Sequence, residues 1–163
     1  MKKLFIVLLI LLTSVGCNRD QGTIIIPKNA FIEPFSNKLC DLSIDSHSNY
    51  IILVFIDGDC STCVADMLNF KKYAKNNSLD ENSIFYIVRT DIIARFEYYL
   101  ENLNFSSRIL IDQNNLFFEY NPEINPNTKI LLLDKKLKIR YSGSTLSEKT
   151  KKRLLTISKK LNR

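Results

Sequence analysis

Two cysteines with two residues between them, Cys60 and Cys63, are the part of this sequence best suited to chemistry. They follow the apolar run 50–56 and open a stretch with helical periodicity. A strand that leads both cysteines into the first turn of a helix places both sulfurs on one face, where the helix N-terminus favours a thiolate. The spacing therefore predicts a dithiol that can open and close a disulfide.

A close cysteine pair could also be a purely structural bridge, because exported proteins keep disulfides. A bridge across two intervening residues closes a very small loop and stabilises little through chain entropy, so redox use explains Cys60 and Cys63 better. Cys40 is interpreted as a small buried hydrophobe, with a resolving thiol as the alternative. The one histidine of the chain, His47, precedes the pair and is interpreted as a surface loop residue, so no metal site is expected.

Two acids lie beside the pair, with Asp59 directly before Cys60 and Asp57 two residues earlier. A carboxylate near the attacking sulfur opposes thiolate formation and raises the pKa of the thiol. We therefore expect both acids to tune Cys60. The alternatives are a helix cap for Asp59 and a solvated loop charge for Asp57.

Apolar runs alternate with helical periodicity along the rest of the chain. We expect Thr90 or Asp91 to cap the second helix, and Thr145 to open the last one in a capping box with Glu148. Strands alternating with helices, followed by a hairpin and a helix, predict an α/β sandwich with a central mixed sheet. The expected strands are 39–44, 50–56, 84–88, 108–111, 129–133 and 137–141, and the expected helices are 61–76, one ending near 102, 116–120 and one from 145 onward.

The N-terminus is typical of a targeting segment. Lys2 and Lys3 precede the apolar run 4–12, which is too short to span a bilayer but suits the core of a signal peptide. Residues 13–17 resemble a bacterial lipoprotein signal, which implies acylation of Cys17, for example with palmitate. The alternatives are ordinary signal cleavage and an uncleaved anchor.

These features predict three parts: a signal peptide over 1–16, a lipidated tether over 17–38 and a folded domain over 39–163. The domain would lie outside the cytoplasm, tethered to a membrane and facing the periplasm or the cell exterior. The chain carries a net charge of +6, and basic residues crowd its last helix, where they could rest against anionic lipid or simply form a solvated surface. No aromatic-interleaved basic stripe accompanies them, so no nucleic-acid partner is expected.

Residues 54–63, with the helix, strand and helix that follow, resemble the thioredoxin-like fold. Residues 108–115 and 129–139 are similar to its membrane-anchored bacterial branch of thiol:disulfide oxidoreductases, related to the alkyl hydroperoxide reductase and thiol-specific antioxidant superfamily. The resemblance covers roughly 39–161 and implies a three-layer sandwich that exchanges disulfides with protein clients and a redox partner protein, without cofactor or metal. It also implies that Cys60 attacks and that Cys63 resolves the mixed disulfide.

The chain departs from the family pattern at three places. Asp59 stands where an aromatic residue is usual. Val54 stands where many thioredoxins have a buried acid, so the proton of Cys63 must move through water, the partner protein or another group. At the cis-proline position that faces the cysteines, counting back from the strand favours Thr128, whereas a two-residue insertion would restore Pro126.

The sequence predicts a membrane-tethered thiol:disulfide oxidoreductase, reductive in direction. The alternative is a non-enzymatic interaction module with a structural Cys60–Cys63 bridge.

Overall fold

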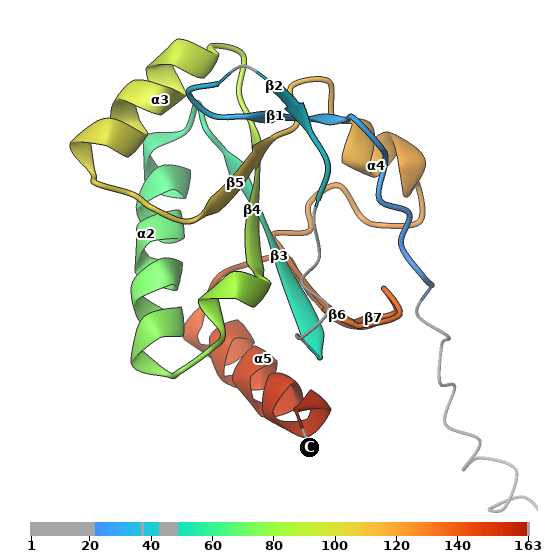
Figure 1. Cartoon of the computed structure of the whole chain (residues 1–163). Coiled ribbons are helices and arrows are strands. Elements are labelled where there is room, and N and C mark those ends of the chain that lie inside the picture. Colours follow the sequence, from blue (N-terminus) through green and yellow to red (C-terminus); the bar gives the residue numbers. More distant parts are fainter. Residues whose placement is uncertain (1–21, 37, 43–48, 163) are drawn as a thin grey trace, which may run out of the picture.

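A computed structural model describes residues 22–36, 38–42 and 49–162 of the chain. These residues form one mixed sheet of seven strands in the order β2-β1-β5-β4-β3-β6-β7, with helices on both sides (Figure 1). The strands are β1 (Phe31–Glu33), β2 (Lys38–Cys40), β3 (Tyr50–Asp57), β4 (Ile84–Arg89), β5 (Arg108–Ile111), β6 (Ile130–Asp134) and β7 (Ile139–Gly143).

Strand β3 is the middle of this sheet. It pairs in parallel with β4 and antiparallel with β6, and every residue from Tyr50 to Ile56 is buried. A continuous apolar run is what a strand covered on both faces needs. Because β3, β4 and β5 run in parallel, their carboxyl ends meet at one edge of the sheet, and the chain enters its helices there.

Helices cover the two faces unequally. α2 (Ser61–Asn76), α3 (Ile93–Asn102) and α5 (Glu148–Leu161) bury residues such as Met67, Phe96 and Leu154 in one core cluster. On the other face, Phe117 of the short α4 (Leu116–Tyr120) and the segment from Ile24 onward form the second cluster. The predicted three-layer α/β sandwich is therefore confirmed.

The folded part of the chain begins earlier than the predicted boundary at residue 39. Thr23 bridges Lys138, the N–H of Ile24 donates to the carbonyl of Leu137 at 3.0 Å, and β1 pairs with β5. Apolar residues that were assigned to a tether are buried against the sheet, so residues 23–36 belong to the domain. The predicted first strand, 39–44, appears as β2, and its last two residues lie outside the described part of the chain, as does Cys17.

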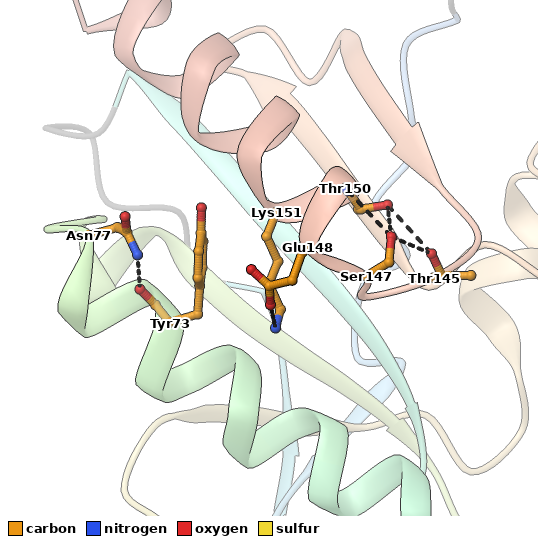
Figure 2. A network of polar contacts seen from close by, with 7 residues as sticks. All are labelled: Tyr73, Asn77, Thr145, Ser147, Glu148, Thr150 and Lys151. Carbon is orange, nitrogen blue, oxygen red and sulfur yellow. Dashed lines mark hydrogen bonds and ion pairs between the residues drawn. The ribbon is translucent and has the colours of Figure 1, made fainter.

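Two helix caps differ from the prediction. The residue before α3 is Ile92, which offers no side-chain cap, and the hydroxyl of Thr90 donates to the carboxylate of Asp59. α5 is capped by Ser147, whose hydroxyl accepts from the N–H of Thr150 at 3.4 Å, while Thr145 donates to Ser147 (Figure 2). Sequence spacing alone could not choose between two hydroxyl residues so close together.

Helical spacing in the sequence from 92 to 103 predicts that the two end residues, Ile92 and Leu103, face inward. They are instead 50% and 42% exposed, because α3 starts after the first and ends before the second. Among the described residues, no helix is both long and apolar enough to cross a membrane.

Gly58 lets the loop after β3 approach its neighbours closely. A Cβ there would lie 2.9 Å from Val88 Cγ1 and 3.0 Å from Phe96 Cδ2, both in fully buried side chains. We expect Gly58→Ala to lower the free energy of unfolding by about 1–3 kcal/mol, the usual cost of overpacking. Urea denaturation measures it.

Gly22→Ala is the matched control, because the nearest atom to its added Cβ would be 3.9 Å away. Equal free energies of unfolding for the two variants would show that Val88 and Phe96 can move away from a Cβ at position 58 without cost.

Candidate functional site

Cys60 and Cys63 lie where β3 passes into α2, both half-buried. Cys60 is the N-cap residue of the helix, and its own sulfur accepts the N–H of Cys63 at 3.3 Å. Cys40, Cys60 and Cys63 are all free thiols. The two sulfurs of the pair therefore share the N-terminal end of one helix, as the spacing predicted.

The environment separates the two thiols. Hydrogen bonds from Cys63 and from the hydroxyl of Thr62, 3.1 Å away, hold the pKa of Cys60 below its ordinary value. Burial, with the nearby Cys60 sulfur adding to it, raises the pKa of Cys63. Cys60 is thus the thiol that ionises first and Cys63 the one held protonated.

Asp57 is exposed at the end of β3 and shapes the turn before Cys60. One of its carboxylate oxygens accepts the N–H of Asp59 at 3.0 Å, and its carbonyl accepts the N–H of Cys60 at 3.3 Å. Its negative charge acts to raise the pKa of both cysteines, although the hydrogen bonds outweigh it at Cys60.

Asp59 is turned away from α2 and does not cap it, because Cys60 does. Its carboxylate accepts the N–H of Asp91 at 2.8 Å and the hydroxyl of Thr90 at 2.9 Å, and it forms an ion pair with Arg95 of α3. The N–H of Asp91 and the Arg95 guanidinium hold the pKa of Asp59 below its ordinary range. Its charge is therefore compensated locally, unlike that of Asp57.

Lys129 is a cation beside the second cysteine that sequence reasoning missed. It lines a cavity of about 170 Å³ together with Cys63, Asp66 and Ser144. Its backbone is held between two strands, with its N–H donating to Gly143 at 2.8 Å and its carbonyl accepting from Phe55 at 3.0 Å. Its charge partly opposes the effect of burial on the pKa of Cys63.

Thr128 and Pro126 precede β6 near the same edge of the sheet. Thr128 is buried, and its N–H donates to the carbonyl of Asn125 at 2.8 Å, whereas Pro126 is exposed. Both line a cavity of about 190 Å³ that also contains Asp57. No peptide bond between described residues is cis. Which of the two faces the cysteines during exchange stays a prediction, with Thr128 favoured because its neighbour Lys129 reaches the cavity of Cys63.

Cys40 is separate from this site. Its strand β2 is four strand spacings from β3, or roughly 19 Å at about 4.8 Å each. It lines another cavity, of about 420 Å³, with Phe85 and Phe105. Its distance argues against a role as resolving thiol. Among the described residues, no cluster of three or more His, Cys, Asp or Glu side chains could hold a metal ion.

The charge on Asp57 can be removed while its shape is kept. We expect Asp57→Asn to lower the pKa of Cys60 further, because Asn still accepts the N–H of Asp59 but no longer opposes the thiolate. Thiol alkylation rates measured against pH on the Cys63→Ser background report the Cys60 pKa.

Asp59→Asn is the comparison variant, since it removes a charge that Arg95 already compensates. Its effect on the Cys60 pKa should be clearly smaller. If Asp59→Asn shifts the pKa as much as Asp57→Asn does, the compensation by Arg95 is not effective.

Comparison with known proteins agrees with this geometry. No family model matches the chain, and neither does any curated protein. Solved structures do, among them a thiol:disulfide interchange protein from Bacteroides sp., with a TM-score of 0.61 and 16% identity over 88% of this chain and 93% of that one.

Two further structures are similar. The thioredoxin domain of a thiol-disulfide oxidoreductase from Bacteroides vulgatus has a TM-score of 0.54 and 16% identity over 82% of this chain and 98% of that one. A putative electron transfer protein from Aquifex aeolicus has a TM-score of 0.60 and 15% identity over 87% and 97%. The chain thus has the thioredoxin-like fold, with a Cys60–Cys63 pair at the start of its first long helix.

Proposed function

We propose that this protein is a thiol:disulfide oxidoreductase that exchanges disulfides with protein clients through Cys60 and Cys63. The observation that carries the proposal is the division between the two thiols. Cys60 has a pKa below its ordinary value at a helix N-terminus, and Cys63 has a raised pKa one turn further in. A structural bridge needs no such division, whereas exchange needs one sulfur to attack and the other to wait.

The chemistry balances in two steps. The Cys60 thiolate attacks a client disulfide, forms a mixed disulfide and releases one client sulfur as a thiolate that takes up a proton. Cys63 then loses its proton and attacks Cys60 Sγ, which releases the second client sulfur. The client gains two electrons and the Cys60–Cys63 pair becomes a disulfide, which a redox partner protein must reduce.

Lys129 supports the second step. When Cys63 ionises, negative charge develops in the cavity that Lys129 lines, and the ammonium group opposes the cost of placing it there. Lys129 thus takes over part of the role that a buried acid at Val54 would have filled. The proton itself leaves to water or to the departing client sulfur.

The charges around Cys60 support a reductive direction. Asp57 opposes the thiolate, and the guanidinium of Arg95 is engaged by Asp59. A strongly oxidising pair needs a highly stabilised thiolate, because that stabilises the reduced form. The hydrogen bonds that lower the pKa of Cys60 act in the oxidising direction, and the charge of Asp57 offsets part of that effect, so the pair gives up electrons more readily than it would without Asp57.

Mixed-disulfide trapping tests the exchange reaction. We expect Cys63→Ser to accumulate disulfide-linked clients that reductant releases, because Cys60 still attacks and nothing resolves the product. Cys60→Ser should trap few clients, since the remaining thiol is half-buried with a raised pKa. Non-reducing gel electrophoresis after acid quenching measures the two yields.

Cys40→Ser in the Cys63→Ser background is the control for the third thiol and should leave trapping unchanged. Equal trapping by Cys60→Ser and Cys63→Ser would overturn the assigned roles. No trapping by either would favour the interaction module with a structural bridge.

We further propose that the protein is exported and held to a membrane by acyl chains on Cys17. Gly16 and Cys17 end a signal-like segment, and each buried CH₂ of an acyl chain contributes about 0.8 kcal/mol to membrane binding. Cys17→Ala should abolish labelling with radioactive palmitate and release protein from the membrane fraction. Cys40→Ala, which also removes one cysteine, should keep both the palmitate labelling and the retention in the membrane fraction. Labelling that persists in Cys17→Ala would place the lipid on another residue.

A further inference from the structure

The described chain starts beside the turn between β6 and β7. Thr23 bridges Lys138, and the N–H of Ile24 donates to Leu137. Only five residues lie between Cys17 and Thr23, and the six steps from one to the other span at most roughly 20 Å. If Cys17 carries lipid, as proposed above, this end of the sheet must stay near the bilayer.

The same end gathers exposed lysines from two elements. Lys135 and Lys136 form the turn after β6, and Lys159 and Lys160 lie in the last turn of α5. Each pair follows or precedes a residue that contacts Tyr50: the backbone of Tyr50 is opposite Asp134, and its hydroxyl has the side chain of Asn162 against it. Figure 1 shows the C-terminal end of α5 at the end of the molecule where β3 begins. We call these four residues the lysine end.

The acids at this end do not cancel the four lysines. Asp134 is paired with Arg140 at 2.7 Å. The carboxylate of Asp80 accepts from Asn82 and Ser83. Among the described residues, none of the four lysines forms an ion pair given by the structure.

The cysteine pair lies at the other end of the sheet. β3 runs eight residues from Tyr50 at the lysine end to Asp57 beside Cys60, which is roughly 23 Å at about 3.3 Å per residue. That separation exceeds two Debye lengths at physiological salt, so the charges of the four lysines are screened from the thiols and do not shift their pKa values.

We infer that the lysine end is a docking surface for anionic lipid. Docking there directs the strands away from the bilayer and places Cys60 at the end of the sheet that is far from the membrane. Charge complementarity and the short distance to Cys17 both place lipid headgroups at this end. The inference rests on the proposed anchor for its orientation, but not on the proposed redox activity. Its consequence is that clients must present their cysteines roughly 20 Å or more above the bilayer surface.

Lysine footprinting on vesicles tests the docking surface. The full chain, with and without Cys17→Ala, is mixed with vesicles of phosphatidylcholine or of equal parts phosphatidylcholine and phosphatidylglycerol. A membrane-impermeant acylating reagent then labels exposed lysines, and mass spectrometry reads each site. We expect labelling of Lys135, Lys136, Lys159 and Lys160 to fall several-fold with the anionic vesicles only, and to recover at high salt.

A four-fold variant provides the affinity readout. Lys135→Gln, Lys136→Gln, Lys159→Gln and Lys160→Gln together should weaken binding of the Cys17→Ala chain to anionic vesicles by more than about tenfold, since each lysine near the surface contributes about fivefold. The control carries the same charge change at the exposed residues Lys28, Lys72, Lys149 and Lys152 and should bind nearly as the parent does.

Three results would overturn the inference: equal weakening by the control set, protection of the control lysines instead, or protection that neutral vesicles produce equally. Loss of acylation at Cys17 with the lysine pattern intact would refute the anchor alone. Client trapping by the four-fold variant on the Cys63→Ser background should be unchanged in solution, so failure of the redox proposal is seen separately.

Discussion

Everything at this site depends on the way β3 passes into α2. The buried strand ends at Asp57, Gly58 lies so close to Val88 that an added Cβ would force a neighbour to shift, and the sulfur of Cys60 then caps the helix. A cap must present an acceptor to the first N–H groups of the helix, and here the acceptor is the sulfur that would attack. The side chains of Cys63 and Thr62 lower the pKa of the reactive thiol most, and the interaction that starts the helix lowers it further.

The pairing of Asp59 with Arg95 joins this turn to α3. Asp59 accepts from the backbone of Asp91 and from Thr90, so the residue before the cysteine braces the neighbouring helix and does not cap its own. Compensation of its charge leaves Asp57 as the acid that acts on the thiols and Lys129 as the cation beside Cys63. Asp57 raises and Lys129 lowers the pKa of Cys63, so the two charges act in opposite directions on the second cysteine.

Periodicity predicted the elements that carry this site and missed what lies between distant segments. The helix 61–76, the strand 108–111 and the helix 116–120 follow from local patterns and are found with those bounds. The apolar run 24–26 predicts a short extended piece at a sheet edge, and Ile24 does bond to Leu137. That residues 31–33 also join the sheet could not be predicted, because their partner in β5, Ile111, is distant in the sequence. Lys129 was missed for the same reason, since only the pairing of β6 with β3 brings it to Cys63.

The central claim is that the Cys60–Cys63 pair takes part in reversible exchange, and its equilibrium with glutathione tests this most directly. The full chain is equilibrated at a series of ratios of reduced to oxidised glutathione, quenched with acid and alkylated, and the fraction oxidised is followed while circular dichroism reports the fold. The account predicts a two-electron transition of the folded protein at a reducing potential, lost in Cys60→Ser and kept in Cys40→Ser. A pair that stays oxidised until the protein unfolds would contradict it.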